Sequence, residues 1–149
     1  MEAIVLAGGR AERLAAVTEG RPKALVPVAG RPLLAYQLGL LARYGIDRVI
    51  VSCAAGQEAV FLEHLTGLGP EVVCAAEPEP LGRGGGIRFA ARARRESGPV
   101  VALNGDELLA VDLRAMVAHN DALGAAATIA VTRMVSSLGV VDLRDEWVT

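Results

Sequence analysis

Short apolar runs alternate with longer amphipathic segments along this chain, and this alternation limits the possible fold more than any other feature. The first run, Ala3–Ala7, is continuous and ends at Gly8-Gly9, which is typical of a buried strand that enters a loop. The same reading predicts five more strands, at Arg48–Cys53, Glu71–Ala75, Pro99–Leu103, Ala125–Val131 and Gly139–Val141.

The segments between these runs have helical spacing. A helix is predicted to begin at Pro32, where the missing proline N–H costs nothing, and to end at Gly45. Further helices are expected over Gln57–Leu65, near Ile87–Arg95, and after Asp112, which can act as an N-cap. Strands that alternate with helices predict a Rossmann-like, three-layer α/β/α fold with a mainly parallel sheet, in one domain over residues 1–149.

Composition excludes several classes of protein. With 15 basic and 17 acidic residues the net charge is −2, so binding to a nucleic-acid backbone is not expected. No apolar run approaches the roughly 20 residues that span a membrane. Two cysteines do not make a disulfide framework, and the N-terminus lacks the basic region of a signal peptide. These features predict a soluble cytoplasmic protein.

Three polar or glycine-rich segments follow predicted strands directly. They begin at Gly8, at Glu77 and at Asn104. Ligands bind at the carboxyl ends of the strands in open parallel sheets, so these segments are expected to form one site. Small residues after Leu6 let main-chain N–H groups approach an anion, and Lys23, the single lysine, adds a fixed charge. A plain glycine-rich turn beside surface cations is the alternative.

Two familiar phosphate-binding motifs are missing. The chain has no Gly-Lys-Ser/Thr sequence of a P-loop and no spaced G-x-G-x-x-G motif. The second predicted strand also ends at Val51-Ser52-Cys53, without the acid that would bind a ribose hydroxyl. A nicotinamide-binding domain is therefore disfavoured.

The first glycine-rich segment nevertheless resembles a known signature. Leu6-Ala7-Gly8-Gly9-Arg10-Ala11-Glu12-Arg13-Leu14, followed by Pro22-Lys23-Ala24-Leu25-Val26-Pro27-Val28-Ala29-Gly30-Arg31-Pro32, is similar to that of the sugar-1-phosphate nucleotidylyltransferases. Within that family it is most like the mannose-1-phosphate and heptose-1-phosphate guanylyltransferases. Ala11 stands where the family usually has a flexible glycine. The resemblance implies the nucleotide-diphospho-sugar transferase fold.

The resemblance also implies a role for individual residues. Arg13 and Lys23 would be catalytic and hold the phosphates, and Asp106 of Asn104-Gly105-Asp106 would bind Mg²⁺. A lone strand-end aspartate is otherwise more often a cap or turn residue. The nucleotide would contact Leu6, Ala7, Gly8, Gly9, Glu77 and Gly82, and the sugar would contact Asn104, Gly105 and Gly139.

The segment from Glu77 bears on the choice of base. Glu77-Pro78-Glu79-Pro80-Leu81-Gly82 resembles the family's base-reading loop. An ionised carboxylate only accepts hydrogen bonds, and the Watson–Crick edge of guanine offers adjacent N–H donors, so GTP is favoured. A UTP- or dTTP-specific enzyme is the alternative, as is a solvated role for Glu77 and Glu79.

The predicted reaction is transfer of NMP from an NTP to a sugar 1-phosphate, with Mg²⁺, to give an NDP-sugar and pyrophosphate. Family members continue well past Gly139 and carry a further metal-binding Asp and a sugar-binding lysine, whereas this chain ends at Thr149. We therefore interpret it as the N-terminal portion of such an enzyme. The alternative is a nucleotide-binding module without turnover. The sequence does not identify the sugar, and an apolar surface left open on a shortened sheet would favour a homo-oligomer.

Overall fold

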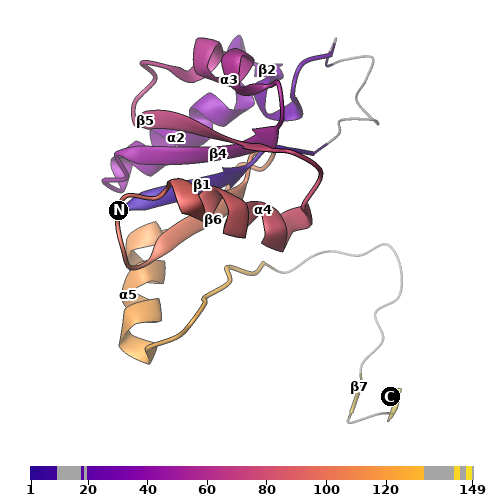
Figure 1. Cartoon of the computed structure of the whole chain (residues 1–149). Helices are drawn as coiled ribbons and strands as arrows, with labels where there is room; N and C mark the ends of the chain where they lie inside the picture. Colours follow the sequence, from indigo (N-terminus) through magenta and orange to yellow (C-terminus); the bar gives the residue numbers. More distant parts are fainter. Residues whose placement is uncertain (10–17, 19, 133–142, 145–146, 149) are drawn as a thin grey trace. The chain divides into compact units, whose positions relative to one another are not determined.

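Figure 1 shows a computed structural model of the chain. The structure describes residues 1–9, 18, 20–132, 143–144 and 147–148. The chain divides into two compact units, Met1–Leu113 and Arg114–Thr149, which are described separately. Within the described residues, every helix is too short or too polar to cross a membrane.

The first unit is built on a four-stranded sheet. Its strands are β1 (Glu2–Leu6), β4 (Arg48–Ala54), β5 (Glu71–Glu77) and β6 (Val100–Asn104). They pair in the order β5-β4-β1-β6, and every pair is parallel. This confirms the predicted parallel sheet. The chain adds β4 and β5 on one side of β1 and then β6 on the other, so the strand order reverses at β1, which is where open α/β sheets bind ligands.

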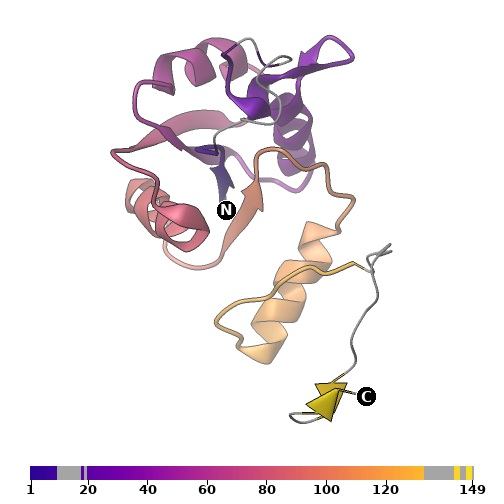
Figure 2. The same cartoon turned by 90° about the vertical axis from the view of Figure 1, so that its right-hand side faces the viewer.

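Helices cover both faces of this sheet. Helices α2 (Leu33–Arg43) and α3 (Glu58–Leu65) bury Leu38 and Phe61 against Val5 and Val51 on one face. Helix α4 (Gly82–Ala90) and the short helix η3 (Ala91–Ala93) cover the other, where Ala90 packs with Ile4 and Ile50. Figures 1 and 2 both place α4 across the sheet from α2. The predicted three-layer arrangement is confirmed in this unit.

The segment that leads from β1 to α2 contains short elements. These are the 3₁₀ helix η2 (Lys23–Leu25) and a hairpin of β2 (Pro27–Val28) and β3 (Arg31–Pro32). The hairpin turns at Ala29 and Gly30, which have φ values of 48° and 78°. Pro32 caps α2, so this helix begins one residue later than predicted.

Helix α4 differs from its prediction. It begins at Gly82 rather than near Ile87, so the glycine run lies inside the helix. Glycine disfavours a helix interior, which is why the sequence predicted a loop. The packing gives the reason for two of these glycines, Gly85 and Gly86. A Cβ atom on Gly86 would lie 2.8 Å from Glu77 Oε1, and one on Gly85 would lie 2.8 Å from the Cβ of Leu81.

The second unit also departs from its prediction. It contains most of α5 (Leu113–Leu123) and a two-stranded pair of β7 (Leu143–Arg144) and β8 (Trp147–Val148). The strand predicted for residues 125–131 is absent from the described sheets, and Ile129 and Val131 are 81% and 89% exposed. Local strand preference does not suffice where no neighbouring strand takes the hydrogen bonds. The strand predicted around Gly139 lies outside the described residues.

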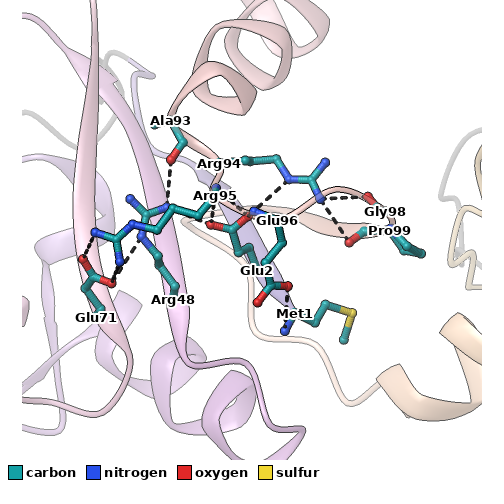
Figure 3. A network of polar contacts seen from close by, with 10 residues as sticks. All are labelled: Met1, Glu2, Arg48, Glu71, Ala93, Arg94, Arg95, Glu96, Gly98 and Pro99. Carbon is teal, nitrogen blue, oxygen red and sulfur yellow. Dashed lines mark hydrogen bonds and ion pairs between the residues drawn. The ribbon is translucent and has the colours of Figure 1, made fainter.

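A polar network closes the amino end of the sheet, opposite the strand ends where ligands are expected (Figure 3). Glu2, Arg48 and Glu71 occupy one register row across β1, β4 and β5. Glu2 is 1% exposed, and its Oε1 lies 2.8 Å from Arg48 Nη1. The main-chain N–H groups of Arg95 and Glu96 donate to the same carboxylate at 3.0 to 3.2 Å.

These contacts set the charge state of Glu2. Burial raises the pKa of its carboxyl, but the N–H groups of Arg95 and Glu96 and the guanidinium of Arg48 outweigh burial. The pKa falls from its ordinary 4.5 to about 2. Because the folded pKa is the lower one, ionised Glu2 stabilises the fold fully above pH 4.5. That contribution is lost as the pH falls from 4.5 towards 2.

We expect Glu2→Gln to lower the free energy of unfolding at pH 7 by about 3 kcal/mol, since it removes the buried charge that faces Arg48 and leaves that guanidinium only the Ala93 carbonyl and the more exposed Glu71. The variant should also lose much of the acid sensitivity between pH 4.5 and pH 2. Urea unfolding at several pH values measures both effects. The comparison variant is Glu71→Gln. It removes the other carboxylate beside Arg48, which lies 3.2 Å from Nε but is 44% exposed, and should cost less than about 1 kcal/mol. Equal losses in the two variants would contradict this account.

Candidate functional site

A cleft of about 450 Å³ lies at the carboxyl end of the sheet, within the size range of small-molecule sites. It is bounded by the ends of β1, β5 and β6, by η2 and by the start of α4. Its lining residues are Leu6, Ala7, Gly8, Gly9, Lys23, Ala24, Glu77, Pro80, Gly82, Arg83, Asn104, Gly105, Asp106 and Glu107.

Main-chain contacts hold the floor of the cleft together. The Ala7 N–H donates to the Ser52 carbonyl at 2.7 Å, and the Gly105 N–H donates to the Leu6 carbonyl at 2.8 Å. A Cβ atom on Gly105 would lie 3.1 Å from that Leu6 oxygen and 3.2 Å from Ala24 Cβ. Glycine at position 105 therefore lets the loop after β6 lie directly against β1 and η2.

An ion pair joins two sides of the cleft. Lys23 Nζ lies 2.6 Å from Asp106 Oδ2, and the two side chains are 42% and 36% exposed. They come from segments 83 residues apart, and the fold brings them together at the point where the strand order reverses. A cation and a carboxylate that remain open to solvent can bind a phosphate and a metal ion, respectively.

Glu77 lies at the end of β5, on another wall of the cleft. Its side chain is 9% exposed. Oε1 accepts a hydrogen bond from Ser52 Oγ at 2.6 Å, and Oε2 accepts one from the Leu81 N–H at 3.1 Å. An ionised carboxylate has about four acceptor positions, so these two bonds leave capacity for a ligand. They also fix the turn between β5 and α4.

The cleft fits a magnesium ion only if the ligand supplies further oxygen atoms. Within the described part of the chain, no group of three or more His, Cys, Asp or Glu side chains could hold a metal ion. Asp106 offers one carboxylate, while the neighbouring Glu107 Oε1 accepts from Asn104 Nδ2 at 2.8 Å. Magnesium is commonly held by one or two carboxylates together with substrate phosphates and water, so this donor set suits a metal–nucleotide complex.

The predicted site residues converge in this cleft wherever the structure describes them. Leu6, Ala7, Gly8, Gly9, Lys23, Glu77, Gly82, Asn104, Gly105 and Asp106 all line it. Arg13 and Gly139 lie outside the described residues. The individual roles of these residues remain predictions.

Sequence reasoning missed two residues that shape the site without lining it. Ser52 holds Glu77, and Gln37 of α2 contacts the loop that carries Asp106. A signal for Gln37 was present. It lies three residues after Leu34 and one before Leu38, on the face of α2 that the leucines predict to be buried. A polar residue at such a position needs a hydrogen-bonding partner.

Comparison with known proteins places this cleft in context. The sequence model of the nucleotidyl transferase family matches residues 2–146, which is almost the whole chain. The chain belongs to this family. The match covers all three segments that form the cleft.

Curated relatives include sugar-phosphate guanylyltransferases. The D-glycero-alpha-D-manno-heptose 1-phosphate guanylyltransferase of Aneurinibacillus thermoaerophilus is 38% identical over 90% of this chain and 58% of its own length. The mannose-1-phosphate guanylyltransferase of Mycobacterium tuberculosis is 34% identical over 90% of this chain and 38% of its own length. The chain thus spans about two fifths to three fifths of these relatives.

Solved structures agree with this family membership. HddC from Yersinia pseudotuberculosis, in complex with GMP-PN, is 27% identical with a TM-score of 0.68, over 80% of this chain and 53% of that one. The inositol-1-phosphate CTP transferase from T. maritima is 30% identical with a TM-score of 0.62, over 70% and 43% of the two chains. The fold is therefore that of the nucleotide-diphospho-sugar transferases.

Proposed function

We propose that the chain binds GTP with Mg²⁺ in this cleft and transfers GMP to a sugar 1-phosphate. The products are a GDP-sugar and pyrophosphate. The observation that carries the proposal is the Lys23–Asp106 pair, with 2.6 Å between Nζ and Oδ2, set in the cleft that Glu77 also lines. The names of the guanylyltransferase relatives support the same reaction.

For this reaction the protein mainly has to align the two substrates and neutralise negative charge on the phosphates. An oxygen of the sugar 1-phosphate forms a bond to the α-phosphorus of GTP. The bond from that phosphorus to the bridging oxygen breaks, and pyrophosphate leaves with the electron pair. The attacking oxygen is already ionised at neutral pH, so no general base is required. Catalysis then rests on alignment and on neutralising the charge that develops.

The roles of Lys23, Asp106 and the glycines follow from their places in the cleft, and that of Arg13 from the family signature. Lys23 would contact the phosphates beside the reacting centre, and Arg13 would hold the β- and γ-phosphates. Asp106 would hold a magnesium ion, which supplies positive charge at the α-phosphate. The small residues Gly8 and Gly9 would let the triphosphate approach the main chain.

The sugar would lie beside the loop after β6, against Asn104 and Gly105. Two of the relatives are named for mannose 1-phosphate and for a manno-heptose 1-phosphate. We infer that the acceptor is a sugar 1-phosphate of this manno class.

Glu77 would select the base. Each of its carboxylate oxygens accepts one hydrogen bond from the protein, and the remaining lone pairs can accept from the adjacent N–H groups of guanine. Uracil and thymine present an acceptor where the carboxylate needs a donor, so UTP and dTTP should bind less tightly.

Thermal unfolding with Mg²⁺ and each of GTP, UTP, dTTP, CTP and ATP tests the choice of nucleotide. At about 100 times its Kd, a nucleotide that binds only the folded protein should stabilise it by about 2.7 kcal/mol. We expect GTP to give the largest shift. Glu77→Gln should remove most of that shift relative to its own nucleotide-free form, because an amide offers one acceptor fewer.

The matched control for this experiment is Glu79→Gln. Glu79 is exposed and does not line the cleft, so the response to GTP should be retained. A shift with UTP equal to that with GTP would refute the guanine assignment. Selective stabilisation by GTP without release of pyrophosphate would instead indicate a binding module.

A further inference from the structure

Gln37 brings an amide group into the apolar face of α2. Its side chain is 3% exposed and lies between the fully buried Leu34 and Leu38. Nε2 donates to the carbonyl of Asn104 at 2.8 Å and also to the carbonyl of Glu107. A single buried side chain thus binds both ends of the turn that carries Asp106.

The hydrogen bonds fix the orientation of this amide. The side chain has two N–H donors on Nε2, and two main-chain carbonyls take them. A flipped amide would place Oε1 against both carbonyl oxygens, where it could only repel them. In the observed orientation, Oε1 is buried and has no hydrogen-bond partner among the described residues. Leaving a buried acceptor unpaired is unfavourable. If position 37 served only the stability of the core, leucine would therefore be the better residue there.

The turn is also held on the side of β1. Gly105 is bonded to Leu6 of β1 through its N–H, and Asn104 Nδ2 bonds Glu107 Oε1 across the turn. Asp106 lies between these contacts, and its side chain reaches Lys23. Release of the two carbonyls from Gln37 would leave the turn held at β1 and remove these two hydrogen bonds to α2.

We propose that Gln37 is a positioning residue that holds the Asp106 carboxylate in place for the metal–nucleotide complex. The kinetic part of this inference rests on the proposed function, whereas the structural part does not. Gln37 contacts no reacting atom. Its effect should therefore fall on turnover, which depends on the alignment of Asp106, and much less on GTP binding.

Gln37→Met tests the inference, because methionine has a similar length and is tolerated in apolar cores. We expect the main-chain amide resonances of Gly105, Asp106 and Glu107 to shift in a ¹H–¹⁵N spectrum. We expect kcat for pyrophosphate release to fall by about 10- to 100-fold, with the KM for GTP within about threefold, since misalignment acts on the reacting geometry. Unchanged turn resonances, or an unchanged kcat in an active protein, would overturn it.

A control variant and a hydrogen-exchange measurement complete the experiment. Tyr36→Phe removes a hydrogen bond from the same helix to the Val28 carbonyl of β2, 2.7 Å away, and should leave the turn resonances and kcat unchanged. In the wild-type protein, the side-chain N–H₂ protons of Gln37 should exchange slowly with solvent. Fast exchange would overturn the inference even if Gln37→Met failed to fold. A wild-type protein that releases no pyrophosphate would refute the proposed function, while the resonance and exchange arms still test the positioning.

Discussion

Replacement of Lys23 by alanine should reduce pyrophosphate release by about 100- to 1,000-fold, the loss typical when one preorganised charge or donor is removed from a reacting centre. The protein should remain folded. Lys23 is 42% exposed at its ion pair with Asp106, and pairs of this kind contribute about 0–1 kcal/mol to stability. A large loss of turnover in a stable protein would identify Lys23 as catalytic.

The comparison needs a variant that removes a cation elsewhere. Arg88→Ala serves this purpose, because Arg88 is exposed on α4 and lies outside the cleft lining. It should retain wild-type turnover. If Lys23→Ala released pyrophosphate at the wild-type rate, the catalytic role of Lys23 would be wrong.

Asp106→Asn should lower turnover by about 100-fold or more. The amide keeps the shape of the side chain but removes the negative charge, and magnesium depends on the one or two carboxylates that a protein offers it. The variant should also need a higher Mg²⁺ concentration for half-maximal stabilisation by GTP. A magnesium titration of the thermal shift, beside the turnover assay, separates loss of the metal from loss of the nucleotide.

Asp121→Asn removes an exposed carboxylate from α5 and is the matched control. Its magnesium dependence should equal that of the wild type. Asp106→Asn with an unchanged magnesium requirement would show that the metal is bound elsewhere, and would leave Asp106 as the partner of Lys23 alone.

The sequence predicted the sheet and the location of the cleft for a simple physical reason. Parallel strands place their carboxyl ends at one edge, so polar residues that directly follow strands must gather there. Gly8 follows β1, Glu77 ends β5 and Asn104 ends β6. Their separation along the chain is large, yet the topology alone brings them to one cleft.

Contacts that depend on packing could not be predicted. The glycines from Gly84 to Gly86 indicated a loop because glycine disfavours a helix interior. The approach of Leu81 and Glu77 nevertheless makes glycine suitable at positions 85 and 86 inside α4. Gln37 differed from its leucine neighbours, but the carbonyls that it binds lie 67 and 70 residues away. Ile129 and Val131 favour a strand locally, and only the fold reveals that they are exposed.

The central claim is nucleotidyl transfer, and the most direct measurement follows both products at once. The wild-type chain is incubated with Mg²⁺, GTP and mannose 1-phosphate or the manno-heptose 1-phosphate, and pyrophosphate and nucleotide-sugar are quantified. The account predicts equal amounts of GDP-sugar and pyrophosphate, formed only when both substrates are present and faster with GTP than with UTP. Saturating GTP binding without either product would contradict it.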